Sequence, residues 1–308
     1  MGLPSSTLDL ADGFTIESNL TYGTRGGVAL QGDLMRPSVP TDHPGILVIV
    51  HGGAWSCGRR RDGVAWWADY IARQLGIATF NIEYRQVEEG GQFPENLMDV
   101  KCAIQWIADN AASWGLDGER IGITGESAGA HLTAMVAVTA HREDLDPKCG
   151  TSPPEVVIAA PYSGPMNIPH WLGTTTLPVE GLAEQAFGDA CEVPIDGCDE
   201  QRSCNRCVDA SPLAHACAAS APLVFVHAPP LYDPWVLPEE SEAVHRSVTD
   251  SGGTSTLVVA NESDIEAIAG CVPAEGFLVE TGAHGFANHC LAAATAATVE
   301  PLLGDALR

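Results

Sequence analysis

The residue of this chain best suited to nucleophilic chemistry is Ser127, which lies between two glycines in the stretch ITGESAGAHL. The segment GESAG, Gly125 to Gly129, fits the pattern G-x-S-x-G, in which a serine occupies a strained turn between a strand and a helix. The apolar run before it is typical of a strand and the run after it of a helix. The N-terminal N–H groups of that helix would point toward the hydroxyl, where negative charge develops during acyl transfer. Because a bare match also arises by chance in tight turns, the prediction depends on partners elsewhere.

A second element, HGGAW, begins at His51 directly after an apolar run. Paired glycines let the backbone turn its N–H groups into a site, as in the HGGG-type runs that stabilise oxyanions. We therefore predict an oxyanion hole made by the backbone N–H groups of Gly53, Ala54 and Ala128. Gly52 is the alternative donor to Ala54. Alanine in the third position costs nothing if its φ is negative.

A serine needs a base, and His284 in TGAHGF is the candidate because it follows the last apolar strand in a glycine-flanked loop. His289 is the alternative. His131 lies four residues beyond the serine in the same predicted helix, so it should point away from the hydroxyl and serve packing. His51 is interpreted as a structural hydrogen-bonding residue that shapes the oxyanion loop, and His227 as a strand-end residue.

The carboxylate that orients the base is predicted to be Asp233 in HAPPLYDPWVLPEES. It follows an apolar strand and precedes a helix, in the chain order serine, acid, histidine. The prolines around it would fix the loop that aims it. Glu239 and Glu240 begin the next helix and are better explained as partners of its dipole. Asp264 is a weaker candidate.

The elements that must position these residues alternate between short apolar runs and helical patterns, which predicts an α/β domain with a mostly parallel sheet flanked by helices. The segment from Asn96 to Ala112 has apolar residues at helical spacing. The expected strands are Gly45–Val50, Ile77–Arg85, Arg120–Gly125, Glu155–Tyr162, Pro222–Ala228 and Thr254–Ala260.

Length and pattern indicate one domain over residues 1–308, with two interruptions. Gly164–Ala210 is rich in proline, glycine and cysteine and lies between two core strands, so we expect a lid insertion. Loops that leave strand C-terminal ends share the edge of the sheet that carries the nucleophile, so this insertion should roof the pocket above the serine. Asn261–Pro273 is the second interruption.

Ten cysteines are many for a cytosolic enzyme of this size. Four of them, Cys191, Cys198, Cys204 and Cys207, fall within the insertion. A zinc site usually needs two close pairs, and only the last two cysteines form one, so disulfides are the preferred interpretation. Disulfides imply an oxidising compartment, and we expect a secreted or periplasmic protein. The first residues lack the features of a signal peptide, so the chain is expected to be a mature form with a new start methionine.

The composition argues against two classes of partner. Acidic residues outnumber basic ones 40 to 15, which gives a formal charge of −25. Nucleic acid and anionic membranes would be repelled. The acidic residues are scattered and do not form a loop of metal-ligand spacing. No run of 18 apolar residues occurs that would predict a membrane span.

Taken together, these motifs resemble the α/β-hydrolase superfamily, and within it the carboxylesterases akin to the hormone-sensitive-lipase group and the bacterial feruloyl-esterase-like hydrolases. The resemblance runs from about Thr15 to the C-terminus. It rests on HGGAW, on EYR at 83–85, on the stretch from Phe93 to Leu132, on the Asp233 loop and on GAHGF. The EYR segment is expected to be structural, with Arg85 paired inside the fold.

The resemblance implies a serine carboxylesterase that uses Ser127, His284 and Asp233, with neither a metal nor an organic cofactor. Expected substrates are small aryl, acetyl, feruloyl-type or short-chain acyl esters, free or attached to a polymer such as a plant polysaccharide or a polyester. Two alternatives stay open: an amide hydrolase, such as a formamidase or peptidase, on the same triad, and a catalytically inactive binding module. The oligomeric state is not predicted. Tryptophans 55, 171 and 235 could line the pocket or simply pack.

Overall fold

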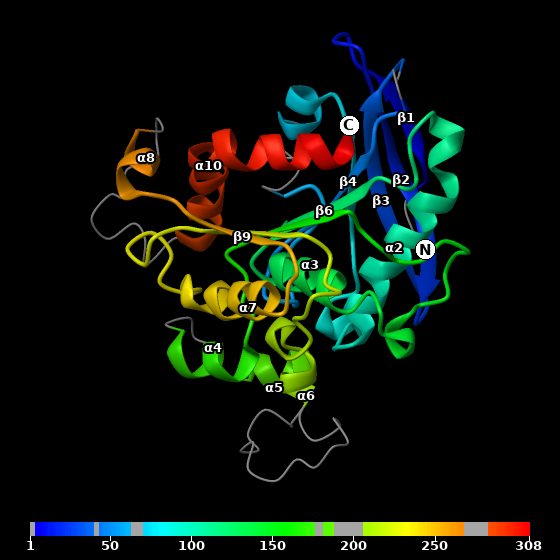
Figure 1. Cartoon of the computed structure of the whole chain (residues 1–308). Coiled ribbons are helices and arrows are strands. Elements are labelled where there is room, and N and C mark those ends of the chain that lie inside the picture. Colours follow the sequence, from blue (N-terminus) through cyan, green and yellow to red (C-terminus); the bar gives the residue numbers. More distant parts are fainter. Residues whose placement is uncertain (1–3, 40–42, 63–69, 176–180, 188–205, 268–282) are drawn as a thin grey trace.

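In the described part of the chain, nine strands form one twisted sheet, shown in Figure 1. The computed structural model describes residues 4–39, 43–62, 70–175, 181–187, 206–267 and 283–308, without the side chains of 182–184, 283–290 and 292. The strand order is β1-β2-β3-β5-β4-β6-β7-β8-β9. The strands are β1 (Ser6–Asp9), β2 (Phe14–Arg25), β3 (Val28–Pro37), β4 (Ile46–Val50), β5 (Ala78–Ile82), β6 (Ile121–Glu126), β7 (Ile158–Tyr162), β8 (Leu223–His227) and β9 (Ser255–Val259).

Helices cover both faces of this sheet, with α10 on one face and α2, α3 and α7 on the other (Figure 1). The helices are α2 (Glu95–Asn110), α3 (Ala128–Val138), α4 (Ile168–Thr174), α5 (Leu182–Phe187), α6 (Arg206–Asp209), α7 (Glu239–Asp250), α8 (Glu262–Glu266) and α10 (Ala283–Leu307). Short 3-10 turns are η1 (Val87–Glu89), η2 (Ala111–Trp114), η3 (Glu143–Leu145) and η5 (Pro212–Ala214). Among the described helices, none is both long enough and apolar enough to cross a membrane.

The predicted strands are present, and the sheet from β5 to β9 is parallel, as expected. All five residues of β4 are buried, which explains why the strand is an unbroken apolar run. Ile46, Val48 and Val50 pack in the core on one face of the sheet. Leu47 and Ile49 pack on the other face, in the core that includes α10.

The first strands differ from the rest because they pair antiparallel: β1 with β2, β2 with β3, and β3 with β5. Most residues of β2 are half-buried, which fits a sheet with one solvated face. Of these strands, β3 lies beside β5, so the antiparallel strands extend the parallel sheet at one end.

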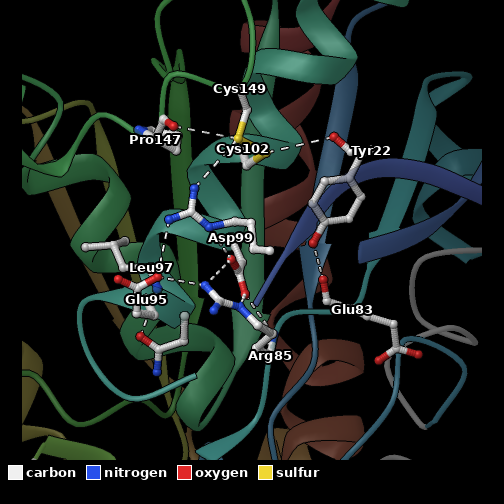
Figure 2. A network of polar contacts seen from close by, with 11 residues as sticks. Tyr22, Glu83, Arg85, Glu95, Leu97, Asp99, Cys102, Pro147 and Cys149 are labelled. Carbon is white, nitrogen blue, oxygen red and sulfur yellow. Dashed lines mark hydrogen bonds and ion pairs between the residues drawn. A yellow bond between two sulfur atoms is a disulfide. The ribbon is translucent and has the colours of Figure 1, made fainter. Parts of the chain in front are cut away.

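A buried ion pair joins Arg85, just after β5, to helix α2 (Figure 2). The Asp99 carboxylate accepts hydrogen bonds from the Arg85 backbone N–H at 3.0 Å, from Nε at 2.9 Å and from Nη2 at 2.9 Å. It also contacts Arg25 Nε of β2 at 3.1 Å. The partly exposed Glu95 pairs with both arginines. The expectation that Arg85 is paired inside the fold is therefore confirmed.

Two disulfide-bonded regions confirm that cysteines of this chain are oxidised. Cys102 of α2 is bonded to Cys149, which ties the helix to the loop before β7. Cys207 in α6 is also disulfide-bonded, and its partner lies outside the described side chains. Cys191, Cys198 and Cys204 lie outside the described residues as well. Of the described cysteines, Cys57 and Cys217 are free thiols.

Replacing Asp99 with alanine should destabilise the fold by about 3 to 5 kcal/mol, because it leaves the Arg85 guanidinium buried without its main partner. The matched Glu95→Ala change should lower the free energy of unfolding by less than about 1 kcal/mol, since that carboxylate is 44% exposed. Equilibrium denaturation of both variants measures the difference. Equal losses would contradict the ranking of the two contacts.

Candidate functional site

Ser127 lies on a sharp turn at the junction of β6 and α3, as its motif predicts. Its φ of 53° and ψ of −119° are unusual for a residue with a side chain. Two backbone hydrogen bonds hold the turn: the Ser127 N–H donates to the Tyr162 carbonyl at 3.0 Å, and its carbonyl accepts from the His131 N–H at 3.0 Å. The residue is half-buried, and it stands at the C-terminal edge of the parallel strands.

The glycines around the serine are required by close main-chain packing. A Cβ on Gly129 would lie 2.2 Å from the Val50 carbonyl oxygen, and one on Gly125 would lie 2.6 Å from the same atom. A Cβ on Gly52 would lie 3.2 Å from the Ser127 Cβ. The loop after β4 and the turn after β6 are therefore in direct contact, and the two predicted elements meet at one place.

The loop after β4 carries the predicted oxyanion donors in a strained conformation. Gly53, Ala54 and Trp55 have φ values of 112°, 51° and 59°. The condition that Ala54 has a negative φ is therefore not met, and the alanine bears left-handed strain of about 1 to 3 kcal/mol. The loop closes on itself because the N–H groups of Ser56 and Cys57 both donate to the Gly53 carbonyl. Ala128 is the first residue of α3.

Asp233 is completely buried in the loop between β8 and α7, where the sequence placed it. Its Oδ1 accepts hydrogen bonds from the backbone N–H groups of Trp235 at 3.1 Å and Val236 at 3.2 Å. Such donors hold the carboxylate in one orientation. The rival Asp264 is exposed in α8, where its side chain accepts from Asn261.

The predicted base belongs to helix α10. His284 belongs to the first turn of α10, so the expected loop is helical at this position. The side chains of His284 and of the alternative His289 lie outside the described residues, as do residues 268–273 of the second interruption. Among the residues described, no three His, Cys, Asp or Glu side chains are grouped as metal ligands.

His131 is buried and hydrogen-bonded through both ring nitrogens. Nε2 donates to the Ala210 carbonyl at 2.6 Å, and Nδ1 accepts from Trp55 Nε1 at 3.3 Å. It therefore does more than pack, because it connects the loop after β4 to the end of the insertion. The rings of Trp171 and Phe187, both in the insertion, contact the Trp55 ring edge-on, with distances between ring centroids of 5.9 and 4.9 Å. In the structure Trp55 is a packing residue of this cluster.

Glu240 has a role that the sequence did not reveal. It begins α7 as predicted, but its buried carboxylate also accepts the N–H groups of Met166 at 3.1 Å and Asn167 at 2.9 Å. The other oxygen contacts His170 Nδ1 at 2.6 Å. Glu240 thus anchors the first part of the insertion. His227, at the end of β8, contacts the Ser241 hydroxyl at 2.6 Å.

Comparison with known proteins gives a family match. Residues 33–248 match the BD-FAE family model. Esterase LipQ of Mycobacterium tuberculosis is 30% identical over 248 residues, which is 77% of this chain and 54% of LipQ. The chain spans about half or less of the length of the curated relatives it matches.

Solved structures share the fold at lower identity. A truncated carbohydrate esterase from gut microbiota has a TM-score of 0.66 at 20% identity, over 82% of this chain and 89% of that one. Esterase 2 of Thermogutta terrifontis with propionate bound has a TM-score of 0.64 at 21% identity, over 92% of this chain and 93% of that one. Another structure of that esterase is phosphoramylated by tabun.

The burial of His131 predicts a pH-dependent stability. Burial lowers the pKa of His131 to about 4, and the hydrogen bond to Ala210 opposes this only in part. The unfolded chain takes up a proton near pH 6.5, while the native ring stays neutral to about pH 4. Between these values the unfolded state binds more protons, so stability falls as the pH is lowered from 6.5 to 4. This residue should account for about 3 kcal/mol of that loss.

The measurement is denaturant unfolding from pH 7 to 4 for the wild type and for His131→Gln, which cannot titrate in this range. The variant should lose less stability than the wild type over this interval. Identical slopes for the two proteins would show that His131 is not the group responsible.

Proposed function

The chain belongs to the BD-FAE family and has the α/β-hydrolase fold, and on that premise we propose that it is a serine carboxylesterase with Ser127 as its nucleophile. The observation that carries the proposal is the strained turn at Ser127, packed against the loop after β4 at the edge of the parallel sheet. Strain of this kind persists where the surrounding structure enforces it, typically at active sites.

In the proposed mechanism His284 takes the proton of the Ser127 hydroxyl while the oxygen attacks the ester carbonyl carbon. The Asp233 carboxylate orients the imidazole and stabilises the imidazolium that forms. The backbone N–H groups of Gly53, Ala54 and Ala128 bind the negative oxygen of the tetrahedral intermediate. The intermediate collapses, and His284 gives its proton to the departing alcohol. Water then repeats the cycle on the acyl-serine and releases the acid.

Esters are favoured over amides as substrates by the names of the relatives. LipQ and the gut and Thermogutta proteins are all named as esterases. The propionate bound to the Thermogutta enzyme supports a short acyl group, and the gut enzyme supports a carbohydrate-linked alcohol. The amide hydrolase on the same triad is the second candidate, and it predicts turnover of anilides. An oxidising location, secreted or periplasmic, is supported by the Cys102–Cys149 disulfide.

Ser127→Ala should lower kcat for p-nitrophenyl acetate by roughly 10⁶, because triad members act as a unit. His284→Ala should be similarly severe, whereas His289→Ala should keep most of the activity. A phosphorylating inhibitor such as paraoxon should add one phosphoryl adduct, located on Ser127 by mass spectrometry. A Ser127→Ala protein with most of its activity would refute the mechanism.

The same assay separates the two candidate functions. The wild type should hydrolyse p-nitrophenyl acetate far faster than the matching p-nitroanilide, because the amine is the poorer leaving group. Comparable turnover of the anilide would favour the amide hydrolase. If His289→Ala is inactive and His284→Ala is active, the general base is His289 and not His284.

We also propose that the insertion, residues 164–210, roofs the substrate pocket. Its described parts support this because Trp171 and Phe187 pack on Trp55, two residues after the proposed donor Gly53. The Trp171 indole donates to the Trp235 carbonyl at 2.8 Å, which ties α4 to the Asp233 loop. The insertion thus contacts the loops that carry both the oxyanion hole and the acid.

Replacing Trp171 with leucine should change substrate selection more than chemistry, since it opens space in this aromatic cluster without touching the triad. The ratio of kcat/KM for a bulky aromatic ester to that for an acetyl ester should shift severalfold. An unchanged ratio in a folded variant would argue that the insertion does not shape the pocket.

A further inference from the structure

His51 directly precedes the proposed oxyanion donors in the sequence, and its side chain is enclosed by neighbouring residues. The residue is 1% exposed, and its ring stacks on Tyr84 at 4.4 Å between centroids. Tyr84 also donates its hydroxyl to the His51 carbonyl at 3.1 Å. A Cβ on Gly58 would lie 2.7 Å from His51 Nδ1, so that backbone closes the remaining side. The imidazole therefore has one orientation.

That orientation fixes the peptide that carries the first proposed donor. His51 Nδ1 lies 2.7 Å from the Gly52 carbonyl oxygen, which can only accept, so Nδ1 carries the proton and donates. The Gly52 carbonyl and the Gly53 N–H are the two ends of one planar trans peptide, and they point in opposite directions. A histidine that holds this carbonyl on one side therefore aims the Gly53 N–H to the other.

The second ring nitrogen of His51 faces a carboxylate that is itself fixed. Glu83 Oε2 lies 3.4 Å from His51 Nε2, and Oε1 accepts from Arg60 Nη1 at 2.8 Å. Arg60 in turn contacts Asp33 at 3.1 Å. The two ring nitrogens of His51 thus face two different oxygen atoms, Nδ1 the Gly52 carbonyl and Nε2 the Glu83 carboxylate.

The backbone of Glu83 is held as firmly as its side chain. The Glu83 N–H donates to the Gln31 carbonyl at 2.9 Å, and its carbonyl accepts the Tyr22 hydroxyl. Figure 2 shows this contact, with the Glu83 carboxylate directed away from Arg85. Burial alone would raise the pKa of Glu83, but the His51 and Arg60 contacts together hold that pKa below its usual range. The group is therefore an anion at neutral pH.

We propose that Glu83 is a positioning residue for the oxyanion hole. It holds His51 with Nδ1–H on the Gly52 carbonyl, and thereby aims the Gly53 N–H at the negative oxygen that forms on the substrate. The inference rests on the proposed esterase function and adds a residue to it that does not touch substrate.

This role predicts a particular kinetic signature. A displaced oxyanion donor weakens binding of the tetrahedral state and leaves binding of the planar ester almost unchanged. Loss of the Glu83 contact should therefore lower kcat and spare KM. It should also weaken a trifluoromethyl ketone, whose serine adduct bears a negative oxygen, by the same factor as kcat/KM.

The test compares two substitutions at residue 83. Glu83→Leu removes the partner of His51 Nε2, and kcat should fall roughly 10- to 100-fold with KM within threefold of the wild type, since removing one oxyanion donor outright lowers kcat by about 10²- to 10³-fold. Glu83→Gln should keep kcat within about threefold, because its amide can donate to Nε2 while its oxygen accepts from Arg60. Glu88→Leu is the control, as an exposed glutamate near the same strand end. If Glu83→Leu does not fold, Glu83→Asp is the substitute, because its shorter side chain withdraws the carboxylate from His51. This variant should also have a lowered kcat and a KM close to that of the wild type.

The outcomes separate this inference from the proposed function. A folded Glu83→Leu protein with kcat within twofold of the wild type overturns the positioning role. So does a loss of kcat that leaves the ketone inhibition constant unchanged, because it reflects only a loss of active protein. If the wild type itself does not hydrolyse esters, or Ser127→Ala equals the wild type, the esterase proposal fails first.

Discussion

The contact on which this structure depends is the one between the end of β4 and the start of α3, where main chain packs against main chain. Gly129 lies so close to the Val50 carbonyl that no side chain could stand there, and Gly125 is restricted in the same way. Because β4 and β6 are neighbouring parallel strands, their C-terminal loops meet at this point. The sheet brings the serine turn and the loop after β4 together, and at this point main-chain atoms, not side chains, set the distance between them.

Much of this arrangement can be predicted from sequence because it depends on local patterns. Unbroken apolar runs identify β4 and β6 since both faces of those strands are covered, and the glycine spacing around Ser127 follows from the close packing just described. The paired state of Arg85 was also predictable. The antiparallel strands β1 to β3 are not predicted from the sequence, because a half-buried strand such as β2 lacks the unbroken apolar run of a buried one.

What could not be predicted depends on tertiary contacts between distant residues. Nothing near Glu240 in the sequence indicates that its carboxylate accepts the N–H groups of Met166 and Asn167. The Nε2 contact of His131 depends on a carbonyl 79 residues away. The sign of φ at Ala54 is set by the closure of its loop, although the residue type alone favours a negative value.

The three consecutive positive φ angles after β4 affect how the molecule folds and how it loses activity on heating. An isolated segment of this sequence would avoid such a conformation, since only glycine adopts it readily. The loop can therefore form only after the sheet and the insertion enclose it, which makes it a late step in folding. Local opening on warming should begin there, so catalytic competence would disappear at a temperature where the helices and strands are still intact. Thermal inactivation of this chain is therefore expected to precede its thermal unfolding.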